Sequence, residues 1–537
     1  MAGLASVGAE KRAGSCPSPG EVRQGSSRPL PGGERPGVAP CIAALLLALA
    51  SCAHPGAPAP TAPAAALAPL PDRDWRDEVL YFVLVDRFAD GDPSNDAAVD
   101  RAAKGAFHGG DLEGLTAHLD EIASLGVTAL WVNPLVKNID GFVTGAGFPD
   151  WAYHGYWADD LGRLDPRFGD EADLRALVAA CHARGIRVLL DVVYNHPGYG
   201  THYLRDPRTR GWLRSTEIGG CGDDDLTSCL AGLPDWKTEL PEVRDFLLDH
   251  QLSWARRFGL DGFRLDTLKH VSHDFWQVHR RRTRAEVSPG FFLLGELWGG
   301  DAENLDAYFA PDEIDAGFDF SFPGSALGWV QGRGRTVAFD RYLRSREKVR
   351  AGHHLAHFLS SHDVPGALHQ LAGDKALFRL AAVLQLTVAG IPVVYYGEEV
   401  GRPGGAWPDN RSDMPWGDRA ILPGRGLSRD DELREFYRRV VAARRAHPAL
   451  SRGKHEAIST EGDLYVFQRR DTASGDAVVV ALNRGSAEAR ATFAPLPEWN
   501  GLLPVDALAA VEATAEAGRL TVRVPPRSAA ILAPVRR

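Results

Sequence analysis

The strongest constraint on the fold of this chain is a regular alternation of short apolar runs with helical segments. The apolar runs are rich in Val, Leu, Ile and Phe, and the segments between them have the 3.6-residue period of amphipathic helices. Near-continuous apolar strands separated by such helices predict a parallel sheet covered by helices. About eight units follow one another over some 330 residues. The predicted strands are 79–85, 127–132, 186–193, 260–265, 291–296, 318–322, 355–360 and 391–396.

Eight strand–helix units predict an α/β protein with a closed (β/α)8 TIM barrel, whose functional residues gather at the C-terminal ends of the strands. The competing fold is an open doubly wound sheet. That fold would place a Gly-rich phosphate-binding loop after its first strand, and the sequence after residue 85 contains no such loop. We therefore expect a catalytic barrel over residues 72–450.

Two further parts complete the predicted domain organisation. The Gly- and Asp-rich segment 197–241 is too long for an ordinary connection, so we expect an excursion domain after the third strand. From residue 455 the sequence pattern changes to short predicted strands separated by turn residues. This pattern predicts a C-terminal antiparallel β-sandwich over 455–537.

The N-terminal segment has the features of an export leader. Residues 1–40 are rich in Gly, Pro, Ser and Arg, and they would not form a core. An apolar run of about a dozen residues follows, too short to span a bilayer but suited to a signal peptide. It ends in a Leu-Ala-Ser-Cys sequence at Cys52, which resembles a bacterial lipobox. We expect a leader over 1–52, a lipid anchor at Cys52 or secretion to the periplasm or medium, and a Pro/Ala-rich tether over 53–71. A chance Ala/Leu run before a linker is the alternative.

Charge and cysteine content narrow the classes of partner. The net charge of −10 and the pI near 6.0 argue against nucleic-acid binding. Cys221 and Cys229 lie eight residues apart in a loop, and in an exported protein they are a plausible disulfide. Cys181 lies in a helical pattern, where we expect it to be buried and unreactive.

Several predicted strands end in side chains suited to acid–base chemistry. The fourth strand is followed by Asp266, with Arg264 two residues before it, and both point to the same side of a strand. A guanidinium at that spacing orients a carboxylate and keeps it ionised, as a covalent nucleophile requires. A structural ion pair is the alternative for this segment alone. The other strand ends carry His196 after the third strand, Glu296 at the end of the fifth, and His362 with Asp363 after the seventh.

Together these segments resemble the four short sequence regions of the α-amylase family of glycoside hydrolases, family 13. The resemblance runs from about residue 78 to the C-terminus. It implies a retaining hydrolase that cleaves internal α-1,4-glucosidic bonds of starch and maltodextrins. Asp266 would be the nucleophile, Glu296 the general acid and then the base, and Asp363 a sugar ligand that stabilises the transition state. The apolar residues before Glu296 are expected to raise its pKa. The substrate-binding residues that the resemblance implies are Arg264, His196, His362, Tyr156, His154, Trp157, Lys269 and His270.

The resemblance also implies calcium. The turn after the first strand is dense in carboxylate and amide oxygens, which suit a hard cation, although a solvated Asp/Asn turn is the alternative. The implied ligands of this first site are Asp90, Asp92, Asn95, Asp96, the carbonyl of Gly109, and Asp111. A second site would use Asn195, Asp235 and the carbonyl of His270, with a further ligand among Asp223, Asp224 and Asp225.

Two departures from the family pattern leave the substrate open. The segment 396–416 resembles family members that act on pullulan, cyclodextrins or short maltodextrins, whereas the Leu-Pro-Asp motif at 233–235 resembles α-amylases proper. After Asp363 the chain reads Val-Pro-Gly-Ala, where many members carry Asn or Arg. A neopullulanase or cyclomaltodextrinase and a trehalose-synthase-type transglycosylase are therefore alternatives. The complete carboxylate triad argues against a non-catalytic glycan-binding relative.

Overall fold

The computed structural model describes residue 70 and residues 73–534. The predicted leader, Cys52 and all but one residue of the predicted tether lie outside these described residues. No helix in the described part is long and apolar enough to cross a bilayer.

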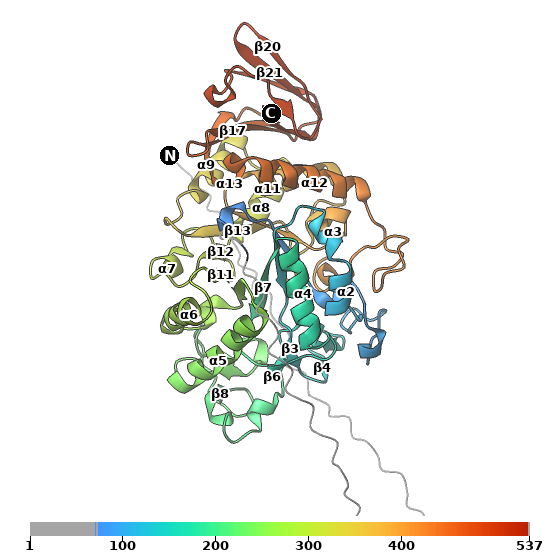
Figure 1. The fold of residues 1–537 in the computed structure, drawn as a ribbon, viewed down its shortest axis with the longest axis vertical. Helices are drawn as coiled ribbons and strands as arrows, with labels where there is room; N and C mark the ends of the chain where they lie inside the picture. Colours follow the sequence, from blue (N-terminus) through green and yellow to red (C-terminus); the bar gives the residue numbers. More distant parts are fainter. Residues whose placement is uncertain (1–69, 71–72, 535–537) are drawn as a thin grey trace, which may run out of the picture.

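The centre of the molecule is a closed, eight-stranded parallel barrel with the strand order β1-β14-β13-β12-β11-β10-β7-β2 (Figure 1). This topology confirms the predicted TIM barrel and excludes the open doubly wound sheet. The strands are short and almost entirely buried because helices cover their outer side and side chains fill the barrel. They are β1 (Leu80–Val83), β2 (Ala129–Val132), β7 (Arg187–Val192), β10 (Gly262–Leu265), β11 (Phe292–Gly295), β12 (Ala316–Phe318), β13 (His354–Phe358) and β14 (Ile391–Tyr395).

One predicted strand is displaced. The sequence predicts a strand over 318–322, but β12 ends at Phe318 and helix α8 begins at Ser321. The carboxylate of Asp319 accepts a 2.9 Å hydrogen bond from the Ser321 N–H and forms an ion pair with Arg346. These contacts turn the chain into the helix, and the apolar residues that follow pack as a buried helix.

The helices around the barrel begin and end at recognisable signals. In α4 (Glu171–Ala183) the side chains of Asp170 and Asp173 form a reciprocal capping box. Helix α5 (Pro241–Phe258) ends at Gly259, whose φ of 67° is a left-handed conformation that favours glycine. The other helices are α1 (Val85–Phe88), α2 (Leu112–Ala117), α3 (Leu119–Ala123), α6 (His273–Glu286), α7 (Asp306–Phe309), α8 (Ser321–Val330), α9 (Thr336–Arg346), α10 (Ala367–Gln370), α11 (Lys375–Thr387), α12 (Asp431–Ala446) and α13 (Pro448–Arg452).

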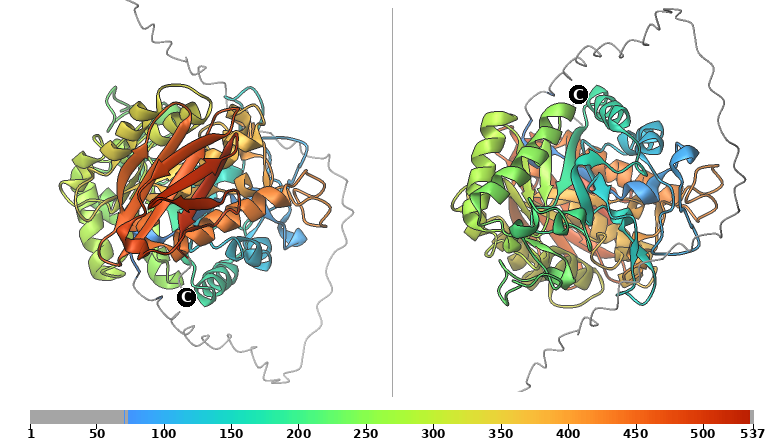
Figure 2. Two further views of the ribbon diagram at one scale, coloured as in Figure 1. Left: turned by 90° about the horizontal axis from the view of Figure 1, so that it is seen from above. Right: turned by 90° about the horizontal axis from the view of Figure 1, so that it is seen from below.

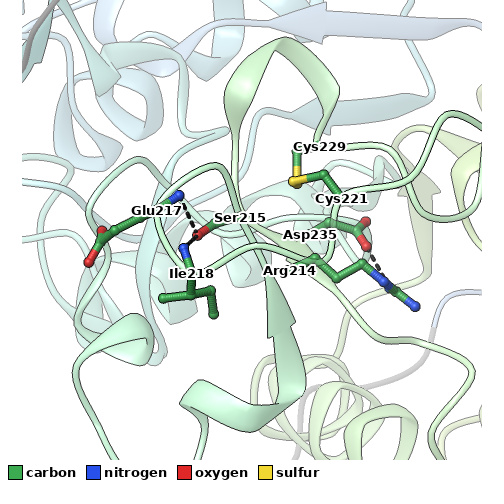
Figure 3. Close-up of a disulfide and its surroundings, with 7 residues drawn as sticks. All are labelled: Arg214, Ser215, Glu217, Ile218, Cys221, Cys229 and Asp235. Atoms are coloured by element: carbon green, nitrogen blue, oxygen red, sulfur yellow. Dashed lines mark hydrogen bonds and ion pairs between the residues drawn. A yellow bond between two sulfur atoms is a disulfide. The ribbon is translucent and has the colours of Figure 1, made fainter.

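The excursion after β7 is a long loop with little regular structure. It contains a two-stranded antiparallel pair, β8 (Leu213–Arg214) with β9 (Asp235–Trp236). Its tip is closed by the Cys221–Cys229 disulfide, which the sequence predicted (Figure 3). Cys181 is buried and free, also as predicted. Two further short pairs lie in the connection between β2 and α4: β3 (Val136–Asn138) with β6 (Ala158–Leu164), and β4 (Phe142–Val143) with β5 (Asp150–Trp151).

The C-terminal domain is the predicted antiparallel β-sandwich. A five-stranded sheet, β15-β16-β17-β22-β19, faces a three-stranded sheet, β18-β21-β20, across a hydrophobic core of its own. This domain packs on helices α9, α11 and α13, and it lies at the opposite end of the molecule from the excursion (Figures 1 and 2). Its strands are β15 (Lys454–Ser459), β16 (Leu464–Asp471), β17 (Asp476–Asn483), β18 (Ala489–Phe493), β19 (Val505–Asp506), β20 (Ala513–Glu516), β21 (Arg519–Val524) and β22 (Ser528–Ala533).

The disulfide should stabilise the excursion measurably. Closing a loop of eight residues contributes about 2.5 kcal/mol by the chain-entropy estimate, so the double variant Cys221→Ser/Cys229→Ser should be cleaved faster by protease within 213–236. Dithiothreitol should produce the same change in the wild type and none in the double variant. Wild-type protein whose cleavage rate is insensitive to the reductant would contradict the expectation.

Candidate active site

The pairing of neighbouring barrel strands places the predicted catalytic carboxylates, Asp266 and Glu296, at the ends of adjacent strands. Leu265, the last residue of β10, pairs with Val192 of β7 on one side and Gly295 of β11 on the other. The residues that follow, Asp266 and Glu296, therefore leave neighbouring strands side by side, and strands in a sheet are about 4.8 Å apart. A side chain at Gly295 would clash at this point, because a Cβ there would lie 2.9 Å from both Leu268 and Ile314.

One buried guanidinium holds three carboxylates together. Arg264 Nη1 lies 2.5 Å from Asp266 Oδ1 and 3.0 Å from Asp191 Oδ1, and its Nη2 lies 3.0 Å from Glu296 Oε1. All four side chains are less than a tenth exposed. Because water is largely excluded, these charges interact far more strongly than they would at the surface. The rings of Trp131, Tyr156 and Phe318 lie 5.3–6.0 Å from the guanidinium carbon and complete its enclosure.

Burial and crowding decide which carboxyl keeps a proton. Burial raises the pKa of Glu296 to about 8, with Arg264 opposing the shift and the negative charge of Asp266 adding to it. Burial likewise raises the pKa of Asp191 to about 7, against the effect of Arg264. Glu296 is therefore largely protonated at neutral pH, which is the direction that the sequence predicted.

Asp363 enters the same site from the loop after β13. Its carboxylate lies 3.1 Å from His362 Nε2 and 3.2 Å from Arg411 Nη2. Burial works against ionisation of this group, but its neighbours His362 and Arg411 outweigh it and lower its pKa. At neutral pH the guanidinium of Arg411 is the charged one of these two neighbours. A cavity lined by Arg264, Glu296, His362 and Asp363, among others, opens at this point.

The predicted aromatic and histidine residues surround the carboxylates. Tyr156 stacks on His362 at 5.2 Å between ring centroids, and its hydroxyl donates a 2.7 Å hydrogen bond to Asp191. Burial lowers the pKa of His362 to about 3 and also lowers the pKa values of His154 and His196. All three imidazoles are therefore neutral at pH 7, and each carries one N–H to donate.

Two predicted substrate contacts point toward the excursion. Lys269 Nζ lies 3.2 Å from Asp225 Oδ1, and His270 Nδ1 lies 2.7 Å from the Asp225 carbonyl oxygen. These contacts pin the excursion to the turn after β10. Trp157 lies edge-on to His154, with ring centroids 4.6 Å apart, and so supports the loop that carries Tyr156.

Two residues that complete the site, Asp191 and Arg411, were not predicted from the sequence. Asp191 is a charged residue inside an otherwise apolar strand, and this local signal could have revealed it. Arg411 lies 48 residues after Asp363, beyond β14; it falls within the segment 396–416 that the resemblance singled out, but its spacing from Asp363 gives no sign that the two meet. Its neighbour Asn410 ties the loop to the site by donating a 2.8 Å hydrogen bond to the His362 carbonyl.

The residues implied for the first calcium site lie in one loop, where Arg101 already pairs with two of them: its Nη2 lies 2.7 Å from Asp90 Oδ2 and 3.1 Å from Asp96 Oδ2. Asp90 Oδ1, Asn95 Oδ1 and Asp96 Oδ1 are buried acceptors without a hydrogen-bond partner. The backbone at Gly109 approaches Asp96 so closely that a Cβ there would clash with its carboxylate. By contrast, the Asp111 carboxylate accepts hydrogen bonds from backbone N–H groups, including that of Gly114 at 2.6 Å, and caps α2. Asp92 similarly accepts a 3.0 Å hydrogen bond from the Ser94 N–H.

The residues implied for the second site also meet. One atom of the Asn195 side-chain amide lies 3.0 Å from the His270 carbonyl oxygen and 3.1 Å from Asp235 Oδ1. With the amide oxygen turned inward, three oxygens converge in a donor set that suits calcium; with the nitrogen inward, hydrogen bonds satisfy the same acceptors. No three His, Cys, Asp or Glu side chains of the described residues could hold a metal by themselves. A metal ion at either place would therefore need amide or carbonyl oxygens as ligands as well.

Comparison with known proteins identifies the family. The model of the alpha amylase catalytic domain matches residues 82–215 and 225–438. The chain belongs to the α-amylase family. The crystal structure of an Anoxybacillus alpha-amylase has a similar fold, with a TM-score of 0.76 and 30% sequence identity. The superposition covers 87% of this chain and 100% of that chain.

Curated α-amylase-family relatives differ in the activities that their names state. The periplasmic alpha-amylase of Escherichia coli (strain K12) is 33% identical over 72% of this chain and 69% of its own length. A cyclomaltodextrinase of Bacillus sp is 31% identical over 77% of this chain and 73% of its own length. Neopullulanase 2 of Thermoactinomyces vulgaris is 30% identical over 86% of this chain and 78% of its own length. The chain is thus an α-amylase-family glycoside hydrolase, as the sequence motifs predicted.

Removing Arg264 should be costly, and more so as the pH rises. The variant Arg264→Leu leaves Asp191, Asp266 and Glu296 buried without their counter-charge, which should lower the free energy of unfolding by about 3–5 kcal/mol at pH 7. When folding raises the pKa of a buried carboxyl, the free energy of unfolding falls as the pH rises toward that raised pKa. The penalty should therefore shrink toward pH 5, as measured by urea denaturation.

Arg350→Leu is the matched control, because it breaks an exposed pair with Asp306 and should cost less than about 1 kcal/mol. An Arg264→Leu penalty equal to that of the control, or one that grows as the pH falls, would contradict this account.

Proposed function

We propose that the chain is a retaining glycoside hydrolase that cleaves α-1,4-glucosidic bonds in cyclodextrins and short maltodextrins. The observation that carries the proposal is the pair Asp266 and Glu296, held on adjacent strand ends by Arg264. Retaining enzymes need their two carboxyl groups about 5–5.5 Å apart, and neighbouring strands of matched register fit that separation. The cyclomaltodextrinase and neopullulanase relatives support this substrate class over starch.

In this proposal the two carboxyls have different tasks because their surroundings differ. Glu296, protonated at neutral pH, donates its proton to the glycosidic oxygen while Asp266 attacks the anomeric carbon and forms a glycosyl ester. Glu296 then takes a proton from water, which displaces Asp266 and releases the sugar with its anomeric configuration retained. Arg264 stabilises Asp266 as the leaving carboxylate.

The remaining residues bind and orient the sugar. Asp363, kept anionic beside Arg411, would accept hydrogen bonds from sugar hydroxyls and stabilise positive charge at the reacting ring. The neutral His154, His196 and His362 would donate N–H groups to the same sugar. Trp298 lies two residues after Glu296 and is 55% exposed, so its ring is available to the sugar on the leaving-group side.

Cleavage of internal bonds in starch is the second candidate. It is favoured by the identity with the Escherichia coli periplasmic alpha-amylase and by the Leu-Pro-Asp motif at 233–235. The two candidates share the same reaction chemistry. They differ in whether the sugar-binding sites favour cyclic and short glucans or the interior of long starch chains.

We also propose a structural calcium ion held by Asp90, Asn95, Asp96 and the carbonyl of Gly109, with Asp92 and Asp111 ordering the same loop. A second ion would lie at Asn195, Asp235 and the His270 carbonyl. Calcium would supply charge neutralisation and loop order at these positions rather than a step in the reaction. Export, with a lipid at Cys52, is supported by the disulfide, because disulfides persist in oxidising compartments.

Initial rates on β-cyclodextrin, pullulan and soluble starch separate the candidates. We expect kcat/KM to be highest for β-cyclodextrin and the first product to be the α-anomer by NMR; a preference for starch would support the second candidate instead. Glu296→Gln should lower kcat by about 100- to 10,000-fold, the range attributed to general acid–base catalysis.

Glu399→Gln is the matched control for Glu296→Gln, since Glu399 is a buried glutamate that accepts a hydrogen bond from Tyr81 and lies outside the carboxylate cluster. Full activity of Glu296→Gln would remove Glu296 from its proposed role.

Calcium should stabilise the folded chain. At a free concentration a hundredfold above Kd, a ligand that binds only the folded state adds about 2.7 kcal/mol, so calcium should raise Tm relative to EGTA. Asp96→Ala should abolish the part of the rise due to the first site, whereas Asp100→Ala, an exposed carboxylate in the same loop, should keep it. An equal rise in both variants would exclude Asp96 as a ligand.

A further inference from the structure

A group of aromatic side chains lies beside the barrel mouth, apart from the carboxylate cluster. We define it as the aromatic platform: Phe142, Phe148, Trp151 and Trp407. Phe142 and Trp407 are 49% and 43% exposed and, with Trp298, are the only Phe or Trp side chains among the exposed large apolar residues of the described part. Exposed apolar side chains that cluster usually mark a binding surface.

The platform borders a cavity whose lining is unusual in composition. The cavity has a volume of about 420 Å³ and is lined by Phe142, Phe148, Trp151, Pro149 and residues of segment 98–106, which include Asp100 and Lys104 as well as Ala and Gly. Its lining residues include aromatic rings, Ala, Gly and Pro, but no Leu, Ile, Val or Met. At the rim an exposed ion pair joins Lys104 Nζ to Asp409 Oδ1 at 2.5 Å. Flat rings with polar groups at the edge suit a ligand that has apolar faces and a hydroxyl rim.

The rings are held in fixed positions. Phe148 and Trp407 lie nearly parallel, with centroids 5.5 Å apart and an angle of 29° between their planes. Phe142 and Trp151 are 5.3 Å apart on the β4–β5 pair. Phe148 rests on the backbone of Gly105, where a Cβ would lie 2.7 Å from its ring. A binding surface arranged in advance loses less conformational freedom when a ligand binds.

Both loops of the platform continue directly into the proposed active site. Trp407 is four residues before Arg411, which contacts Asp363, so the chain between them spans at most about 14 Å. On the other loop, Trp151 is followed by His154 and Tyr156. The platform is therefore connected to the site through Arg411 on the Asp363 side of the carboxylate cluster.

We propose that the aromatic platform binds an α-glucan chain several sugar units beyond the cleaved bond. The proposal rests on the proposed function, because it extends the same substrate along the same cleft. The C–H faces of glucose rings would pack on Trp407 and Phe142, and the sugar hydroxyls would reach Lys104 and Asp409 at the rim. The platform would make the enzyme favour substrates long enough to reach from the carboxylate cluster to the aromatic platform.

The test compares a long and a short linear substrate. In the double variant Phe142→Ala/Trp407→Ala, kcat/KM for maltoheptaose should fall about tenfold, as expected for the loss of two ring contacts. The value for maltotriose, which is too short to reach the platform, should stay within about twofold of wild type. Trp407→Phe should retain most of the long-chain preference, and Leu502→Ala, an exposed residue of the C-terminal domain, should change nothing.

The outcomes separate this inference from the proposed function. Wild-type hydrolysis of both substrates with an unchanged maltoheptaose preference in the double variant would overturn the platform alone, as would an equal loss on both substrates. If the wild type hydrolysed neither, the proposed function would fail, and calorimetric titration of maltoheptaose into wild type and double variant would still decide the binding. Concentration-dependent dimers that the double variant abolishes, with the substrate profile unchanged, would show that a second copy of the chain occupies the surface instead.

Discussion

The buried guanidinium of Arg264 is the interaction on which the site depends. It contributes one positive charge to a nearly dry space that contains three carboxyl groups. A single cation cannot stabilise three buried anions, so at least one proton is held there at neutral pH. Burial directs that proton to Glu296, whose pKa is about 8. The arrangement thus separates a proton donor from a nucleophile although both are carboxylic acids.

The barrel makes this arrangement possible by matching the ends of its strands. Asp191 pairs in register with Arg264, and Leu265 pairs with Gly295, so three acidic side chains emerge around one guanidinium. A closed barrel imposes this convergence because all its strands end on the same face. The C-terminal sandwich packs on the outer helices α9, α11 and α13 and lies at the opposite end of the molecule from the excursion (Figure 1), so it leaves the carboxylate face open to substrate.

The loops specialise the site, and two of their features are linked. The loop after β1 contains the oxygen cluster of Asp90, Asn95 and Asp96, and its later part forms one wall of the cavity at the aromatic platform. An ion that orders this loop would also order that wall. Calcium binding and the binding of longer glucan chains are therefore coupled in our proposals through one segment of backbone, without any contact between the ion and the sugar.

The sequence by itself determined the eight strand–helix units, the C-terminal sandwich, the disulfide and the residue types at the strand ends. These features depend on local periodicity and short spacing. It misplaced the strand at 318–322, because an apolar run alone does not distinguish a buried strand from the buried start of α8. Only the tertiary structure placed Arg411 beside Asp363 and Trp407 beside Phe148, since these pairs are far apart in sequence and meet only when the barrel closes. The proton on Glu296 likewise depends on enclosure, which no local pattern records.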